Sequence, residues 1–360
     1  MERRCLQWKR MAAATAPTAG TKVKRKPAKR RSPDRSQTLR RTVQILFAAL
    51  NVWIGVEFYL FVRHYETGGT SVFVPRPPGV EGWLPIASLM NLKYWLATGE
   101  VPAVHPAGMF LLMAFLAIAL LFRKSFCSWL CPIGTLSEWL WRAGRSMFGR
   151  NLRIPRWADV PLRSLKYILM GLFLYAVGGM STEAIRAFLE SPYGLIADVK
   201  MLNFFRYLSV TAAVTLGVLA VASIFIQNFW CRYLCPYGAL LGLLSAASPA
   251  RIRREPEICI DCAKCARACP SLLPVDKLLT VRSPECTGCV ECVAVCPAEG
   301  ALYLSLPRKR KLPAWALAAG IAAVFLATVG YARQAGYWRT DLPSRIYFEL
   351  IPRAHEFSHP

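Results

Sequence analysis

The stretches Cys259–Pro270 (CIDCAKCARACP) and Cys286–Pro297 (CTGCVECVAVCP) carry the same pattern, Cys-x2-Cys-x2-Cys-x3-Cys-Pro. Gaps of two residues let three thiolates of one loop reach three corners of a small inorganic cluster. The proline then turns the chain, so that the fourth cysteine reaches elsewhere. This spacing indicates a metal cofactor and not a framework of disulfide bonds.

The pattern is typical of two [4Fe–4S] clusters, in which the fourth cysteine of each run binds the other cluster. We expect cluster I to be held by Cys259, Cys262, Cys265 and Cys296, and cluster II by Cys286, Cys289, Cys292 and Cys269. A pair of zinc sites is the alternative, although zinc motifs usually leave a longer gap between two CxxC pairs. Because reduced thiols are typical of the cytoplasm, we predict a cytoplasmic α+β module over residues 251–307.

The remainder of the chain is both apolar and basic. Hydrophobic residues make up 54% of the 360 residues, yet the formal net charge is +24. A soluble nucleic-acid binder could carry that charge, but it would not carry several long apolar runs. A membrane protein with basic loops on one side explains both facts. We therefore predict a polytopic α-helical membrane protein, with the lipid bilayer and not nucleic acid as its surroundings.

Five apolar runs come close to the roughly 20 residues that a membrane helix needs. They cover residues 43–62, 104–122, 165–180, 208–226 and 313–332. We expect about five transmembrane helices. Four of them belong to a membrane domain over residues 42–250, and the fifth lies within 308–335.

Basic residues are distributed unevenly among the connecting segments. The loop 123–166 contains nine Lys or Arg residues against two acidic ones. By the positive-inside rule, this loop, the region 227–312 and the basic tail 1–41 are cytoplasmic. The tail has too few apolar residues to form a core, so we expect it to be disordered. The short tail 336–360 is then outside, and the predicted location is the bacterial inner membrane.

The membrane domain contains a repeat that ends in a CxxxCP motif. Residues 126–136 (FCSWLCPIGTL) match residues 230–240 (WCRYLCPYGAL), and the motif cysteines are Cys127, Cys131, Cys231 and Cys235. Cysteines at i and i+4 of a helix point to one side, and Pro-x-Gly either ends that helix or starts the next one. The four thiols either hold a metal ion or a further cluster, or act as redox-active pairs, or pack as small hydrophobic groups.

Membrane helices with two CxxxCP motifs, followed by a two-cluster module, resemble the membrane polyferredoxins of the NapH, NosR and CcoG type. The resemblance covers residues 40–335. It implies electron transfer between the quinone pool, or a cytoplasmic donor, and a respiratory or periplasmic redox partner protein, with quinone as a candidate ligand. A subunit of a quinol dehydrogenase is the enzymatic role that it suggests.

Two other functions remain open. A CcoG-like reductase or maturation factor would serve the assembly of a metalloenzyme, and a membrane scaffold would use its cysteines to bind zinc. The chain departs from the relatives in three respects. It lacks the outer flavin-binding domain of the NosR type and the folded outer domain of the CcoG type, and it has one span more than a minimal NapH chain.

Overall fold

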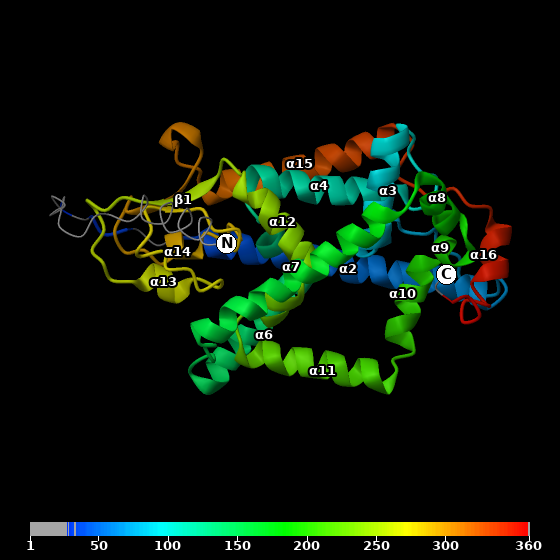
Figure 1. Ribbon diagram of the computed structural model, residues 1–360, viewed down its shortest axis with the longest axis horizontal. Helices are drawn as coiled ribbons and strands as arrows, with labels where there is room; N and C mark the ends of the chain where they lie inside the picture. Colours follow the sequence, from blue (N-terminus) through cyan, green and yellow to red (C-terminus); the bar gives the residue numbers. More distant parts are fainter. Residues whose placement is uncertain (1–26, 28, 32–33, 359–360) are drawn as a thin grey trace. The chain divides into compact units, whose positions relative to one another are not determined.

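The computed structural model describes residues 27, 29–31 and 34–358. The described chain is mostly helical, with one small sheet (Figure 1). It divides into two compact units. Unit 1 contains residues 1–45, 118–135 and 241–321, and unit 2 contains residues 46–117, 136–240 and 322–360.

The elements follow one another in a mainly helical order. The helices are α2 (Ser36–Glu66), η1 (Pro78–Trp83), α3 (Pro85–Thr98), α4 (Pro106–Phe122), α5 (Phe126–Trp129), α6 (Pro132–Phe148), α7 (Arg156–Gly179), α8 (Thr182–Glu190), α9 (Pro192–Leu195), α10 (Ala197–Arg206), α11 (Val210–Phe225), η2 (Trp230–Leu234), α12 (Pro236–Ala246), α13 (Lys264–Ala268), α14 (Glu291–Ala294), η3 (Pro307–Lys309), α15 (Ala314–Gln334) and α16 (Ser344–Leu350). The strands are β1 (Arg251–Arg254), β2 (Thr280–Val281) and β3 (Leu302–Ser305).

Among the described residues, three helices are long and apolar enough to cross a membrane: α2, α7 and α15. They cover the predicted span 43–62 fully, and the spans 165–180 and 313–332 except for one end residue each. Many of their large apolar side chains are exposed, including Val52, Leu172 and Leu326. Such exposure is unfavourable in water and suits contact with lipid.

The other two predicted spans form shorter helices. Residues 104–122 give α4, which has 17 residues, and residues 208–226 give α11, which has 16. The helix α4 ends where Arg123 adopts a left-handed backbone conformation, with φ of 64°. The helix α11 is bent by 80° relative to α10. Only the two helices together are long and apolar enough to cross a membrane. The described chain therefore offers three spans, or up to four if the bent pair is one span, where about five were predicted.

A buried apolar cluster in unit 2 joins the C-terminal end of α2 to η1, α10 and α16. Phe61 of α2 packs edge-on against Tyr347 of α16, with ring centroids 5.2 Å apart. Val80 of η1 and Val199 of α10 belong to the same cluster. Figure 1 shows α8, α9 and α16 lying close together in this unit. Side chains from residues 342–357, within the predicted tail 336–360, are thus part of a packed core.

A network of buried charged groups fixes the loops of unit 2 that follow α2. The Arg76 guanidinium donates to Asp198 Oδ2 at 2.8 Å and to Glu81 Oε1 at 2.6 Å. Glu81 also accepts hydrogen bonds from the Thr340 hydroxyl at 2.7 Å and from the Gly108 amide at 3.0 Å. Burial alone raises the pKa of Glu81, but the Arg76 guanidinium lowers it to about 2, so the carboxyl group stays ionised.

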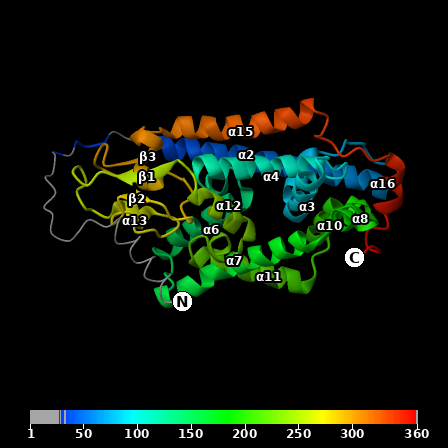
Figure 2. The same ribbon diagram turned by 45° about the horizontal axis from the view of Figure 1, so that its top comes forward.

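Unit 1 contains the small antiparallel sheet, with strand order β2-β1-β3 (Figure 2). Ile252 of β1 pairs with Val281 of β2 and with Leu304 of β3. These three apolar residues are buried, and Ile252 and Val281 line the cavity that also contains Cys269, Cys286, Cys289 and Cys292.

The segment before α2 belongs to unit 1 as well. The Arg31 amide donates to the Pro297 carbonyl, and the Glu299 amide donates to the Lys29 carbonyl, both at 2.9 Å. The helix α2 begins at Ser36. Parts of the predicted tail 1–41 are therefore ordered, while residues 1–26, 28 and 32–33 lie outside the described residues.

Removing the central cation of the unit 2 network tests its contribution to stability. We expect Arg76→Ala to lower the free energy of unfolding by about 3–5 kcal/mol, because two buried carboxylates then lack a cation. The matched control is Arg186→Ala, since the Arg186–Glu190 pair at 2.8 Å is more than half exposed on both sides. That change should cost at most about 1 kcal/mol. Thermal unfolding of the purified protein in detergent measures both, and equal losses would contradict the role of the network.

Candidate iron–sulfur centre

The two cysteine runs adopt the same unusual backbone conformation. Asp261 and Gly288 occupy the same position of the two runs, and their φ angles are 53° and 62°. Ala263 and Val290 also correspond, with φ of 53° and 51°. Left-handed conformations are unfavourable for residues other than glycine, and particularly for a β-branched residue such as valine. Two such residues per loop turn the backbone amides inward, where they can bind an anionic group.

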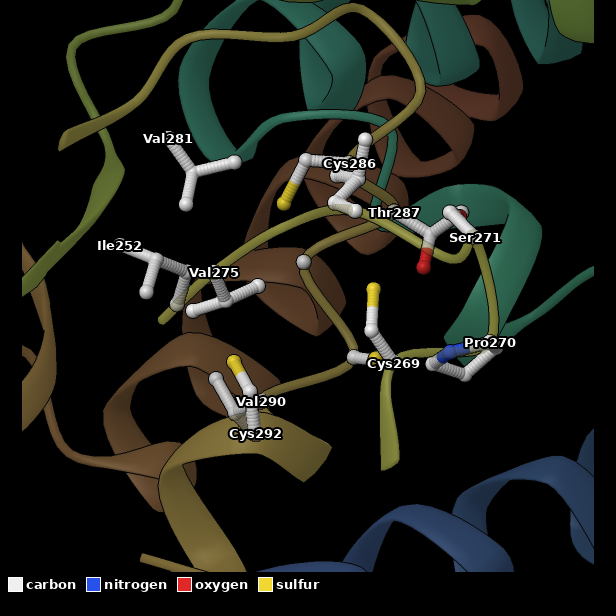
Figure 3. Close-up of a pocket in the computed structure, with 13 residues that line it drawn as sticks. Ile252, Cys269, Pro270, Ser271, Val275, Val281, Cys286, Thr287, Val290 and Cys292 are labelled. Atoms are coloured by element: carbon white, nitrogen blue, oxygen red, sulfur yellow. The ribbon is translucent and has the colours of Figure 1, made fainter. Parts of the chain in front are cut away.

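The structure brings Cys269, Cys286, Cys289 and Cys292 around one cavity. Figure 3 shows the sulfur atoms of Cys269, Cys286 and Cys292 directed into this space. Apolar side chains form much of the remaining wall, namely Ile252, Leu273, Val275, Val281 and Val290. These are the four cysteines expected for cluster II, and Cys269 comes from the other run.

Burial strongly affects the thiols of this cavity. Cys269, Cys289 and Cys292 are each less than a tenth exposed. Burial raises the pKa of Cys269 to about 11, and the pKa of Cys289 to about 12. For Cys289, the Arg40 guanidinium partly opposes this increase. Thiolates at these positions therefore require nearby positive charge, which bound iron would supply.

The other four cysteines also approach one another. Burial raises the pKa of Cys296, and the nearby Cys259 and Cys262 thiols raise it further. Burial also raises the pKa of Cys265, and the nearby Cys296 and Cys259 thiols raise it further. All four side chains are only partly buried. The four cysteines expected for cluster I thus lie near one another, and they are more exposed than Cys269, Cys289 and Cys292.

Eight cysteines in two sets of four supply the number of thiolate donors that two [4Fe–4S] clusters require. In the described part of the chain, no three His, Cys, Asp or Glu side chains converge closely enough to hold one metal ion. Thiolates of a tetrahedral zinc site lie about 3.8 Å apart, given Zn–S bonds of about 2.3 Å. A cubane separates its ligands more widely. The twelve described cysteines are all free thiols, so disulfide bonds do not compete for these positions. The donor set therefore fits [4Fe–4S] clusters.

The first CxxxCP motif lies in unit 1, between helix α5 and the start of helix α6. Cys127 lies in α5, and Cys131 directly precedes Pro132, the first residue of α6. The Gly134 amide donates to Cys131 Sγ at 3.4 Å, so this thiol caps the helix. Gly134 is required here, because a Cβ atom would collide with the Cys127 carbonyl oxygen. Pro-x-Gly therefore begins the next helix, which is one of the two predicted outcomes.

The second motif repeats this geometry in unit 2. Cys231 lies in η2, a π-helical turn, and Cys235 directly precedes α12. The Gly238 amide donates to Cys235 Sγ at 3.2 Å. The sequence pattern predicted that each cysteine pair lies at positions i and i+4 of one helix. This prediction was wrong, because the helical turn ends before the second cysteine in each motif. Each pair lies in its own unit.

A carboxylate of α7 anchors the second motif. Asp159 accepts hydrogen bonds from Arg232 Nη2 at 3.0 Å and from the Tyr233 hydroxyl at 2.6 Å. Both donors lie between the two motif cysteines. This contact was not expected, because Asp159 had been counted only as one of two acidic residues in a basic loop.

Within unit 1, the first CxxxCP segment is bound directly to the loop of Cys286 and Cys289. The Ser128 hydroxyl donates to the Thr287 carbonyl at 2.7 Å, and Trp129 Nε1 donates to the Gly288 carbonyl at 3.2 Å. Trp129 is fully buried. Neither residue was singled out in the sequence, because the two segments are 159 positions apart.

Comparisons with known proteins agree with this geometry. A family described as "4Fe-4S dicluster domain" matches residues 251–297, and one described as "4Fe-4S binding domain" matches residues 104–155 and 208–255. The chain is 49% identical over 328 residues to YccM of Escherichia coli (strain K12), provisionally named an electron transport protein. This match spans 89% of the chain and 92% of YccM. The chain belongs to the membrane polyferredoxin family.

More distant members of the family share part of the chain. The ferredoxin-type protein NapH of E. coli (strain K12) is 26% identical over 58% of this chain and 70% of its own length. The regulatory protein NosR of Pseudomonas aeruginosa is 30% identical over 51% of the chain, which corresponds to 25% of NosR. No solved structure gave a significant match.

The tight contact at Gly288 yields a test of the attachment between the CxxxCP segment and the cluster II loop. A Cβ atom on Gly288 would collide with Ser125 Oγ, whereas a Cβ on Gly300 would meet its nearest atom at 3.8 Å. Both glycines have positive φ, so alanine costs about 1–2 kcal/mol at either position. We expect Gly288→Ala to cost about 1–3 kcal/mol more than Gly300→Ala, owing to overpacking. Thermal unfolding in detergent measures the difference, and equal costs would argue against close packing at Gly288.

Proposed function

We propose that the protein is a membrane-bound electron carrier with two [4Fe–4S] clusters. Cys259, Cys262, Cys265 and Cys296 hold cluster I, and Cys286, Cys289, Cys292 and Cys269 hold cluster II. A bound cluster accepts and releases single electrons. The observation that carries the proposal is the convergence of four thiols, one from the other run, on one largely apolar cavity. The name of YccM, an electron transport protein, supports the same function.

The different exposure of the two cysteine sets suggests their roles. The partly exposed cysteines of cluster I allow a redox partner protein to approach this cluster from solvent. The cysteines of cluster II are more buried, and their loop is bound to the first CxxxCP segment. One hydrogen bond, from Ser128 to the Thr287 carbonyl, joins the neighbour of Cys127 to the neighbour of Cys286. We propose that this contact links cluster II to Cys127 and Cys131 as a relay towards the membrane, where quinone is the candidate partner.

The zinc-binding scaffold is less well supported than the electron carrier. Zinc motifs usually leave a longer gap between two CxxC pairs than these two runs do. The two families that match this chain are described by 4Fe-4S binding.

We further propose that the cysteine module faces the cytoplasm of a bacterial inner membrane. The loop 123–166, with nine basic residues against two acidic ones, supports this orientation. This orientation requires the 17-residue α4 and the bent pair α10–α11 to cross the membrane together with α2, α7 and α15. The helix α15 then carries the chain from the cytoplasm to the outer side.

Replacing single ligands should remove the clusters selectively. We expect about eight iron atoms per wild-type chain, and about four in Cys262→Ser or Cys289→Ser, because each variant loses one cubane. The control is Ser164→Ala, because Ser164 is an exposed residue of α7 that lies outside both cysteine runs. Iron and acid-labile sulfide analysis, with EPR spectra of the reduced protein, measures the result. Stoichiometric zinc in place of iron would disprove the proposed function.

The orientation can be tested with reporters at the two ends of α15. A phosphatase that is active only outside the cytoplasm should be active when fused after Pro360, and inactive when fused after Arg308. The expected difference follows from one crossing between these positions. Equal behaviour of the two fusions would remove α15 from the membrane and overturn the proposed orientation.

A further inference from the structure

A completely buried arginine lies beside the loop that would hold cluster II. Arg40, near the start of α2, is 0% exposed. A buried guanidinium is unfavourable unless negative charge or hydrogen-bond acceptors face it. Its neighbours Gln37 and Gln44 lie on the same face of the helix, at spacings of three and four residues. The polar face that these three side chains form therefore binds carbonyl groups of other segments of unit 1.

The contacts of this face lead to the cysteine loop. Arg40 Nη2 lies 3.7 Å from Glu291 Oε2, and Glu291 directly precedes Cys292. Arg40 Nε donates to Gln37 Oε1 at 2.9 Å, and Gln37 Nε2 donates to the Cys289 carbonyl at 3.0 Å. The guanidinium thus contacts Glu291, the neighbour of Cys292, and it is linked to the Cys289 carbonyl through Gln37.

The same face also holds the first CxxxCP segment. Arg40 Nη1 and Gln44 Nε2 donate to the Ser128 carbonyl at 3.2 and 3.0 Å. Because Ser128 in turn donates to the Thr287 carbonyl, Arg40 occupies the junction between α2, the CxxxCP segment and the cysteine loop. A purely structural arginine could serve here, but a neutral residue could donate the same hydrogen bonds without the cost of burying a charge.

We propose that Arg40 raises the reduction potential of cluster II and so makes this buried cluster the electron acceptor of the pair. The inference rests on the proposed function, in which Cys269, Cys286, Cys289 and Cys292 hold a [4Fe–4S] cluster. One-electron reduction adds a negative charge to such a cluster, and an apolar surrounding disfavours that charge. A fixed buried cation nearby offsets this effect, because little water screens it. Glu291 acts in the opposite direction, so the two side chains set the potential together.

The proposal predicts opposite effects for two neutral substitutions. At a fixed potential near the midpoint, Arg40→Gln should lower the ratio of reduced to oxidised cluster II by about tenfold. Glu291→Gln should raise the same ratio. Arg40→Lys, which keeps the charge, should restore most of the wild-type value. Arg41→Gln is the matched control, since the adjacent Arg41 is exposed.

The measurement is a potentiometric titration of the purified full-length protein, followed by EPR. Cluster II is assigned as the signal that Cys289→Ser removes. A shift of this signal alone, with wild-type iron content, supports the proposal. Unchanged potentials in both Arg40→Gln and Glu291→Gln would overturn it, as would an equal shift in Arg41→Gln. If Arg40→Gln loses iron, the other two variants test the proposal. A raised ratio of reduced to oxidised cluster II in Glu291→Gln, with a near wild-type ratio in Arg40→Lys, supports it, and an unchanged ratio in Glu291→Gln overturns it. Absence of iron from the wild type would instead disprove the proposed function.

Discussion

A thiolate buried in an apolar interior is unfavourable unless positive charge and hydrogen-bond donors face it. Unit 1 is organised around this constraint. Its cysteine loops contain left-handed residues that turn backbone amides inward, even at Val290, where the conformation is strained. Helix α2 adds the buried Arg40, and the CxxxCP segment adds donors to the loop carbonyls. The iron of the clusters would supply the remaining positive charge.

Unit 2 contains buried carboxylates whose charge is balanced by neighbouring side chains. Arg76 pairs with both Glu81 and Asp198, so the buried charges compensate one another. Asp159 similarly receives Arg232 and the Tyr233 hydroxyl, and thereby positions the second CxxxCP segment. In both units, buried polar groups hold loops in place next to helices whose outer surfaces are apolar.

The repeated CxxxCP motifs have related local structures and different surroundings. In each, the second cysteine caps a following helix through a glycine amide. The first motif is bound to the loop of Cys286 and Cys289, whereas the second is bound to α7 through Asp159. The duplication therefore conserved the turn and not its partners, which is consistent with different roles for the two cysteine pairs.

The sequence by itself determined what depends on local spacing and composition. Two-residue gaps between cysteines identified the cluster-binding runs, and apolar length identified the spans within α2, α7 and α15. It did not show that residues 104–122 form a helix of only 17 residues or that the helix over 208–226 is bent relative to α10, because apolar composition does not reveal where a helix stops or bends. Only the tertiary structure showed that Arg40, Ser128 and Trp129 join the start of α2, the first CxxxCP segment and the cysteine loop. Arg40 had been assigned to a disordered basic tail, and its role depends on residues such as Glu291 that are distant in the chain. Contacts of this kind leave no periodic pattern in the sequence, so they emerge only when the chain is folded.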